Sequence, residues 1–354
     1  MTTPTLPEPY AAVAMQLTAR ALDICPDNAA ARAQIMAHIG EIEGQIRTSM
    51  IFISQYSGLP VRLAVLPEYL FTSYPGRISV PDFAARAAFA MDGPEYAALG
   101  ELARRLEIYL VVNAYETDPH FPGLYFQACV IFAPDASVAL RYRRLNSMFA
   151  PTPHDVWDRY LAIYGIEGVF PVADTPIGRL AAIASEEVLY PEIARAHALR
   201  GSEVFVHSSS EIGSPLMTAK ALAKRARAME NMAYLVSANT AGIAGSAMPL
   251  GSADGNSLVC DWKGQVLAES NSGETFTAFA AIDIAALRAA RRKPGMTNFL
   301  SRQRTALFGA VYGGETHQRA NSLIDGNSIT IPDRDFFLRA SGETIARLDK
   351  DGLI

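Results

Sequence analysis

The chain has 354 residues, of which half are apolar and 19% are charged, a composition that excludes intrinsic disorder, coiled coil and low-complexity scaffold. Its formal net charge of −5, from 31 basic and 36 acidic residues, gives no electrostatic reason to expect nucleic acid or an anionic membrane as a partner. Only five of the basic residues are Lys, the first of them Lys220, and the others are Arg.

Targeting and redox features point to the cytoplasm. Residues 1–10 contain neither a basic residue nor an apolar run, unlike a signal peptide, and no apolar run approaches the ~18–20 residues of a membrane span. The cysteines Cys25, Cys129 and Cys260 lie far apart without CxxC spacing, and none of the six histidines falls at metal-ligand spacing. We therefore expect a cytoplasmic protein with no membrane partner, no disulfide framework and no metal site.

Strands and helices alternate along the chain in two similar passes. The first pass predicts strand, long helix, strand, helix, strand and hairpin over residues 10–17, 29–53, 62–66, 95–106, 109–115, and 125–133 with 137–142. The second pass predicts the same order over residues 179–184, 192–199, 203–207, 218–232, 234–239, and 257–262 with 266–268, followed by a last strand over 276–284.

Two copies of one strand–helix unit, with no Gly/Ser-rich linker between them, predict a single α/β domain with an internal pseudo-twofold. The natural packing is two mixed sheets face to face with helices outside, a four-layer α-β-β-α sandwich. We assign residues 1–292 to this domain. Periodicity fades from about Arg291, so residues 293–354 are expected to form a C-terminal extension that builds an interface or wraps another surface.

Several catalytic and binding motifs are missing from the sequence. There is no GxxxxGK[ST], no GxGxxG after a strand, no GxSxG and no HExxH. Phosphate-cradling loops, dinucleotide folds, α/β-hydrolases and HExxH metalloproteases therefore have no support.

Three predicted strand ends carry residues suited to acyl transfer. Glu68 directly follows a buried strand and Pro67, and partial desolvation there would make it a general base, although a surface Glu at a strand exit is the plainer interpretation. Arg144 ends the first hairpin, where a basic residue usually faces solvent. Ser185 lies where a strand turns into a helix that Pro191 begins, so the next N–H could face an oxyanion, or Ser185 could simply cap the helix.

In this order the motifs resemble the nitrilase, or carbon–nitrogen hydrolase, superfamily. The family has a Glu after a strand, a Lys at a YRK-like hairpin end and a Cys at an elbow six residues before Pro-Glu. Glu68 matches the first place, while Arg144 stands in the Lys place and Ser185 in the Cys place. Glu187 fits the acidic position two residues later, and Pro191 the conserved Pro.

The resemblance extends over residues 10–292. Further segments similar to the family pattern lie at residues 200–204, 225–231, 239–242 and 255–259. The resemblance implies the α-β-β-α sandwich already inferred, and assembly into homodimers or larger homo-oligomers.

The resemblance also implies roles for individual residues. Glu68 would be the base, Arg144 and the backbone N–H of Glu186 would stabilise the oxyanion, and Ser185 would stand at the nucleophile position. A second carboxylate lies about seven residues before a Gly in the family, which selects Asp158, with Asp155 as a competitor. The pocket would be lined by residues near Tyr69, Phe149, Trp157, Tyr190 and Ser208, although core packing explains the aromatic ones equally well. No metal or organic cofactor is needed.

Two departures from the family pattern affect the chemistry. Ser185 replaces a thiol, and an alcohol is much harder for a carboxylate to activate. Arg144 keeps the positive charge but cannot act as an acid, and the scarcity of Lys before Lys220 makes natural drift plausible. Three hypotheses follow: a chain deliberately disarmed by Cys-to-Ser replacement, a natural serine amidase, and a natural non-catalytic member that binds a small ligand or takes part in an assembly.

The expected reaction is hydrolysis of a small linear amide through an acyl intermediate. Nitrilases usually have a Trp directly after the nucleophile, whereas this chain has Glu186, closer to the acidic residue of aliphatic amidases. The resemblance therefore favours an amidase over a nitrilase.

Overall fold

The computed structural model describes residues 7–214, 216–314 and 318–354. Residues 1–6, which belong to the segment considered above for a signal peptide, lie outside the described residues, as does His317.

The first sheet is built by the N-terminal pass and joined by one strand from the end of the second pass. Its parallel centre consists of β1 (Tyr10–Ala14), β3 (Val61–Val65) and β5 (Tyr109–Thr117). Antiparallel strands extend it on both sides, namely β6 (Tyr125–Phe132) and β7 (Val138–Arg143) beyond β5, and β15 (Phe279–Ile282) beyond β1. The two-residue strand β4 (Phe89–Ala90) pairs with the end of β5.

The second sheet has the same kind of arrangement. Its parallel centre consists of β9 (Gly178–Ala184), β10 (Val204–Ser208) and β11 (Tyr234–Ala238). Antiparallel strands flank this centre, namely β8 (Ala173–Thr175), β13 (Ser257–Cys260) and β14 (Val266–Ser270). In each sheet, the carboxyl ends of the parallel strands therefore lie at the same end of the sheet, and the loops that follow the strands begin there.

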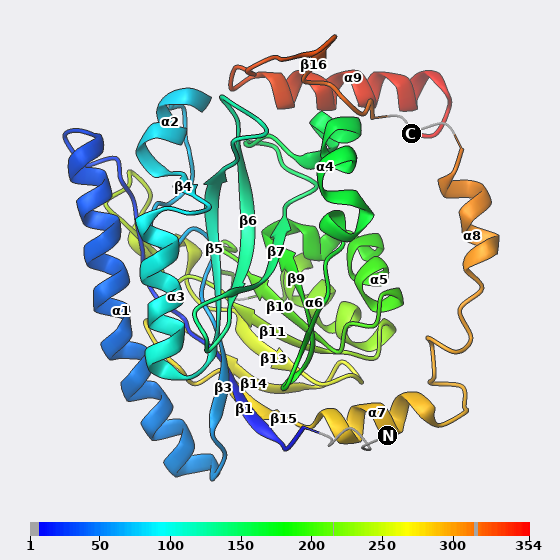
Figure 1. The fold of residues 1–354 in the computed structure, drawn as a ribbon. Helices are drawn as coiled ribbons and strands as arrows, with labels where there is room; N and C mark the ends of the chain where they lie inside the picture. Colours follow the sequence, from blue (N-terminus) through cyan, green and yellow to red (C-terminus); the bar gives the residue numbers. More distant parts are fainter. Residues whose placement is uncertain (1–6, 215, 315–317) are drawn as a thin grey trace.

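Helices cover the outer face of each sheet, so the predicted α-β-β-α sandwich is confirmed. The first sheet is covered by α1 (Asn28–Ser57), α2 (Val80–Ala87) and α3 (Pro94–Leu106), and the second by α5 (Pro191–Leu199) and α6 (Ala219–Glu230). Figure 1 shows α1 and α3 on one side of the strands and α5 and α6 on the other. The long helix α1 begins after Asp27, whose side chain accepts a hydrogen bond from the Ala30 amide, and ends at Gly58 in the left-handed conformation.

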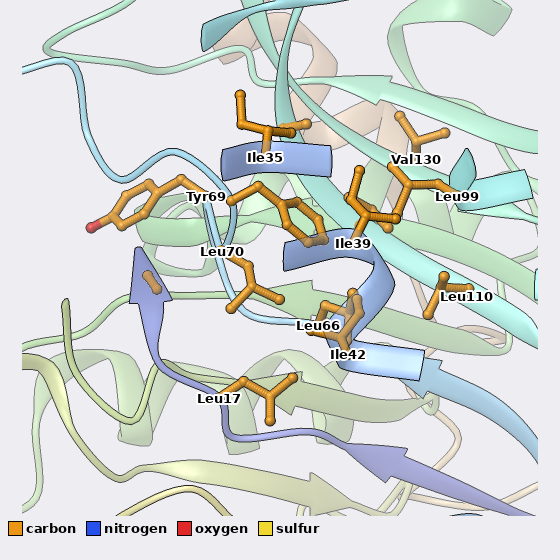
Figure 2. Close-up of a cluster of buried hydrophobic side chains, with 14 of the residues drawn as sticks. Leu17, Ile35, Ile39, Ile42, Leu66, Tyr69, Leu70, Leu99, Leu110 and Val130 are labelled. Carbon is orange, nitrogen blue, oxygen red and sulfur yellow. The ribbon is translucent and has the colours of Figure 1, made fainter. Parts of the chain in front are cut away.

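Alternation along the strands divides the hydrophobic core into layers. On β5, Leu110 and Val112 pack with the α1 layer, whereas Val111 faces the other sheet. Figure 2 shows the α1 layer, in which isoleucines of α1 meet leucines from strands, loops and α3; the labelled ones are Leu17, Ile35, Ile39, Ile42, Leu66, Leu70, Leu99 and Leu110. This packing fixes the position of Leu66 directly after β3, and therefore the position of Glu68 two residues later.

Sequence periodicity misjudged some of the elements. The last predicted strand, 276–284, is a strand only over β15, because Asp283 caps a helix, α7 (Ile284–Arg292), through a hydrogen bond from the Ala286 amide. The structure also contains α4 (Trp157–Val169), the 3-10 helices η1 (Pro153–Val156), η2 (Ser185–Leu189) and η3 (Leu250–Ala253), and the short paired strands β2 (Ala19–Arg20) and β12 (Ile243–Ala244).

The C-terminal segment runs along one side of the molecule rather than through its core. It contains α8 (Thr305–Tyr312), a small hairpin of β16 (Ile324–Asp325) and β17 (Ser328–Ile329), and α9 (Phe336–Lys350). Figure 1 shows this segment passing from α7 by way of α8 to α9, which lies across the end of the molecule near α4. The division into a domain over residues 1–292 and an extension over 293–354 stays a prediction.

Among the helices within residues 7–214, 216–314 and 318–354, none combines the length and the apolar character that crossing a bilayer requires.

Candidate active site

The loops that carry Glu68 and Ser185 meet where the two sheets face each other. Glu68 follows β3, and its amide donates a hydrogen bond to the carbonyl of Ser209 (3.2 Å). The Ser208 hydroxyl donates to the carbonyl of Leu66 (2.8 Å), and Ser208 pairs in register with Ala184, the residue before Ser185. The end of β10 therefore connects the Glu68 loop of one sheet to the Ser185 loop of the other.

Glu68 is buried, with 2% of its surface exposed, and its two carboxylate oxygens have different partners. Oε1 accepts a hydrogen bond from Gln127 Nε2 (2.7 Å) and lies 3.5 Å from Arg144 Nη1. Oε2 accepts a hydrogen bond from the Ser210 hydroxyl (2.8 Å). A carboxylate held on both sides in this way has a fixed orientation, as a general base requires.

Arg144 connects the Glu68 loop to the elbow at Ser185. Its Nη1 donates to Gln127 Oε1 (2.7 Å), its Nε donates to the Asn146 carbonyl (2.6 Å), and its Nη2 makes a close ion pair with Glu186. Gln127 thus bridges Arg144 and Glu68. A guanidinium in a water-poor site stabilises developing negative charge more strongly than it would in water.

Ser185 forms a strained elbow between β9 and η2. It adopts a φ of 52°, in the left-handed region that costs a residue with a side chain about 1–2 kcal/mol, and only 5% of its surface is exposed. Within the described part of the chain, no group forms a hydrogen bond with its hydroxyl. Its carbonyl lies 2.8 Å from His207 Nε2. A strained residue at a strand end is typical of an active-site elbow.

Glu187 is fully buried behind the elbow. Its Oε1 accepts hydrogen bonds from the amides of Leu145 (2.7 Å) and Asn146 (2.9 Å), and its Oε2 accepts one from the Tyr142 hydroxyl (2.8 Å). Burial raises the pKa of Glu187 to about 7, although Arg144 and these hydrogen bonds oppose the rise. Glu187 therefore ties the residue after Arg144 to the elbow that carries Ser185.

The structure does not bring Asp158 into this cluster. Asp158 is exposed in the first turn of α4, and the side chain of Asn321 accepts a hydrogen bond from its amide (2.9 Å). The competitor Asp155 is buried, but it caps η1 with Thr152 and accepts a hydrogen bond from Ser322. Gly165, from which the count to Asp158 was made, lies inside α4 at a kink of the helix, and a catalytic role for Asp158 stays a prediction.

Of the expected pocket residues, Tyr69 and Ser208 lie beside Glu68. Tyr69 follows it directly and makes a close hydrogen bond with Ser210, the residue that also donates to Glu68. Phe149, with 62% of its surface exposed, lies in the loop before η1, and Trp157 begins α4. Within the described residues, no hydrogen bond, ring pair or cation–ring contact joins either side chain to Glu68, Arg144 or Ser185.

A cavity of about 570 Å³ opens next to the elbow, beneath the C-terminal segment. Glu186 and Tyr190 border it on the elbow side, Asn146 on the Arg144 side, and Phe337 and Thr344 of α9 on the opposite side. Tyr190 is therefore the expected pocket residue that reaches this cavity. The C-terminal segment supplies much of its wall.

Sequence reasoning missed Gln127 and His207. Gln127 is a polar residue within the otherwise apolar strand β6, which is buried along its whole length, and this contrast was the available signal. His207 ends an apolar run in β10 in the same way. Within the described residues, no cluster of His, Cys, Asp and Glu is arranged to hold a metal ion.

Comparison with known proteins identifies relatives of this chain. The family model for carbon–nitrogen hydrolase matches residues 28–292. The formamidase of Bacillus thuringiensis (strain Al Hakam) is 28% identical over 244 residues, which make up 68% of this chain and 66% of the formamidase. The formamidase of Bacillus cereus (strain B4264) is 29% identical with the same coverage. The chain thus spans slightly less than two thirds of these relatives.

Solved structures share the fold. A carbon–nitrogen hydrolase from Helicobacter pylori G27 superposes with a TM-score of 0.62 at 22% identity, covering 86% of this chain and 98% of that one. A mutant of the amidase from Nesterenkonia sp. AN1, in complex with butyramide, superposes with a TM-score of 0.57 at 21% identity, covering 85% and 96%.

Proposed function

Because the chain belongs to the carbon–nitrogen hydrolase family, we propose that it hydrolyses the C–N bond of a small linear amide at the cluster of Glu68, Arg144 and Ser185. One observation carries the proposal. Glu68 Oε1 lies 3.5 Å from Arg144 Nη1, and the same guanidinium pairs with Glu186, the residue after Ser185. The base Glu68, the cation Arg144 and the nucleophile position Ser185 therefore belong to one connected, buried cluster.

The proposed reaction has two halves. The Ser185 hydroxyl oxygen bonds to the amide carbon while Glu68 takes the hydroxyl proton, and the resulting oxyanion is stabilised by Arg144 and the Glu186 N–H. The C–N bond then breaks, and the nitrogen takes the proton from Glu68 and leaves, as ammonia from a primary amide or as an amine from a substituted one. In the second half Glu68 removes a proton from water, the hydroxide displaces Ser185 from the acyl carbon, and the proton returns to Ser185.

The serine form is expected to be slow. An alcohol needs stronger activation than a thiol, and the described residues offer Ser185 no neutral imidazole at its hydroxyl. His207 meets the Ser185 carbonyl instead. Arg144 can stabilise charge but cannot donate a proton as an acid would.

A small linear amide fits the observations on substrate. The formamidases act on formamide by name, and the amidase complex holds butyramide. The cavity of about 570 Å³ beside Glu186 is roomy for either molecule. The absence of a Trp after Ser185, where Glu186 stands, favours an amide over a nitrile as the substrate.

A second candidate is a non-catalytic protein that binds a small amide or carboxylate. It is favoured by the pairing in the cluster: both oxygens of Glu68 accept hydrogen bonds from Gln127 and Ser210, and the Ser185 hydroxyl has no partner among the described residues. In this alternative the site retains the family's shape but lacks an activated nucleophile.

Turnover of formamide and butyramide by four chains separates these functions: the chain as printed, Ser185→Cys, Ser185→Cys with Arg144→Lys, and Ser185→Cys with Glu68→Gln. We expect Ser185→Cys to raise the rate by orders of magnitude, Arg144→Lys to raise it further, and Glu68→Gln to abolish it. Binding of butyramide without turnover by any of the four would favour the non-catalytic candidate. Absence of both binding and turnover would contradict both.

We further propose that the chain forms a homodimer or a larger homo-oligomer. The helix α8 supports this, because it buries none of its residues and exposes Leu307, Phe308, Val311 and Tyr312. Light scattering on the full chain measures the mass directly. A monomer at micromolar concentration would contradict the proposal. The cytoplasmic location stays a prediction.

A further inference from the structure

We propose that His207 is a positioning residue that orients the peptide between Ser185 and Glu186, and so aims the Glu186 N–H at the reacting carbonyl. The inference rests on the proposed function, in which this N–H stabilises the oxyanion. It concerns a residue of β10, outside the segments that carry Glu68, Arg144 and Ser185.

The His207 ring is held between two elements of the second sheet. Its Nε2 lies 2.8 Å from the Ser185 carbonyl oxygen, and its Nδ1 lies 2.8 Å from the Ser237 hydroxyl on β11. His207 and Ser237 are neighbours in the parallel register of β10 and β11, and both are completely buried. The ring therefore has a fixed place relative to the sheet.

The partners of the ring determine its tautomer. A carbonyl oxygen can only accept, so Nε2 carries the hydrogen and donates it to Ser185. Nδ1 is then the acceptor, and the Ser237 hydroxyl donates to it. Burial, followed by the charge of Lys224, lowers the pKa of His207 well below its ordinary value, which keeps the ring neutral.

Because the peptide group is rigid, the hydrogen bond to the Ser185 carbonyl also sets the direction of the Glu186 N–H. The peptide group is planar and trans, so the Ser185 carbonyl and the Glu186 N–H lie in one plane and point in opposite directions. A donor that fixes the carbonyl on the sheet side therefore fixes the N–H on the opposite side. Within residues 7–214, 216–314 and 318–354, His207 is the only side chain that bonds to this carbonyl.

The conformation of the elbow gives this donor a task. Ser185 has a φ of 52°, in the left-handed region that costs about 1–2 kcal/mol, and this φ does not fix the orientation of the peptide that follows. The hydrogen bond from His207 holds that peptide in the observed orientation. The side chain of Glu186 pairs with Arg144, but a flexible side chain does not fix the plane of its own amide.

The test compares His207→Leu with His207→Gln in the Ser185→Cys background. Leu removes the donor, whereas the Gln side-chain nitrogen can donate from about the position of Nε2. We expect Leu to lower kcat for butyramide by about 10²-fold with KM changed less than threefold, since loss of one oxyanion donor has about this effect. Gln should recover most of the loss.

The inhibition constant of butyraldehyde provides a second test, because it would not change if His207 had only a structural role. Its carbonyl carbon bonds to the sulfur of Ser185→Cys, the thiol proton moves to Glu68, and the carbonyl oxygen becomes the oxyanion that the Glu186 N–H binds. The inhibition constant should rise in His207→Leu by the factor lost from kcat. His38→Leu is the matched control, because His38 is also buried but lies on α1, and it should change neither value.

A crystal structure of His207→Leu decides the matter whether or not the chain hydrolyses amides. We expect the Ser185 carbonyl to turn away from position 207. An unturned peptide overturns the inference, and so does an equal loss of kcat in His207→Leu and His207→Gln. Failure of Ser185→Cys to hydrolyse any amide would instead contradict the proposed function and leave the crystal structure as the deciding measurement.

Discussion

Two buried clusters of charge lie on either side of the end of β7, and they are built differently. In the first, Arg141 and Arg143 meet Glu116 and Asp118. Arg143 Nε donates to Glu116 Oε1 and Arg141 Nε to Glu116 Oε2, both at 2.8 Å, while Arg143 Nη1 lies 2.6 Å from Asp118 Oδ2. Every carboxylate in this cluster has a guanidinium in contact.

The second cluster, around Arg144, has a surplus of carboxylates. Arg144 pairs with Glu186 and lies 3.5 Å from Glu68, while Glu187 is held by two backbone amides and the Tyr142 hydroxyl rather than by a cation. Burial accordingly raises the pKa of Glu187 to about 7.

The comparison separates a structural role from a chemical one for adjacent residues of the same type. Arg143 makes ion pairs with Glu116 and Asp118 and lies against the rings of Phe126 and Tyr164, so it stabilises the fold. Arg144, just beyond the end of the strand, lies in the second cluster, where the carboxylates outnumber the cations. Such a group can accept protons and bind a polar ligand. The following changes test this division.

The largest expected effect comes from removing the structural arginine. Arg143→Met leaves Glu116 and Asp118 buried with only part of their pairing, and breaking a buried pair in this way costs about 3–5 kcal/mol. Urea unfolding measures the loss. Arg104→Met, which removes an exposed pair with Glu101, is the control and should leave the midpoint unchanged. Equal midpoints for both would contradict the structural role of Arg143.

Glu187→Gln should change the pH dependence of stability. The pKa of Glu187 rises from 4.5 to about 7 on folding, so between these values the folded chain holds a proton that the unfolded chain has lost. Stability attributable to Glu187 therefore falls as pH rises from about 4.5 to 7. At about 1.4 kcal/mol per pKa unit, Gln should be more stable by about 3 kcal/mol at pH 8 and equal at pH 4.

Glu187→Gln is a matched replacement because both backbone amides donate to Oε1, which Gln retains. Glu187→Leu removes this acceptor and serves as the comparison, with an expected loss of stability at both pH values. A pH profile of unfolding that is the same for the printed chain and Glu187→Gln would refute the raised pKa.

Gln127→Leu should have a moderate effect, because Gln127 bridges the two charged groups of the site. Its loss leaves Glu68 Oε1 and Arg144 Nη1 without their shared partner, at a cost of about 1–2 kcal/mol. We expect about tenfold lower kcat in the Ser185→Cys background. Gln45→Leu, on the exposed face of α1, is the control. An unchanged kcat would show that the bridge does not orient the site.

The smallest effect is expected from Asp158→Asn, because Asp158 is exposed and lies outside both clusters. Stability should change by less than about 0.5 kcal/mol, and kcat in the Ser185→Cys background by less than twofold. A tenfold loss of kcat would restore Asp158 as the second carboxylate that the motif spacing had predicted.

Much of the fold followed from local patterns. The alternation of strands and helices predicted the two sheets and the helices that cover them, since hydrophobic periodicity within an element is a local property. The tail was harder to predict. α8 and α9 bury few residues, and the predicted last strand ran on to Ile284, the first residue of α7, because Ile282 and Ile284 continue the apolar run of β15.

For the site, the sequence indicated where Glu68, Arg144 and Ser185 stand but not what they touch. Gln127 lies between Glu68 and Arg144 because β6 is antiparallel to β5 and β7, a register that no local pattern specifies. The motif spacing suggested Asp158 for the group, whereas the structure places it, exposed, in the first turn of α4.

By itself, the sequence determined the order of the elements, the apolar faces that join them and the residue types at three strand ends, because each of these depends on neighbours a few positions away. Only the tertiary structure decided which of the two arginines serves the site, that Glu187 is buried with hydrogen bonds from two backbone amides and the Tyr142 hydroxyl, and that His207 reaches the carbonyl of Ser185. These facts depend on which segments distant in the chain pack together, and packing at long range is set by the whole fold.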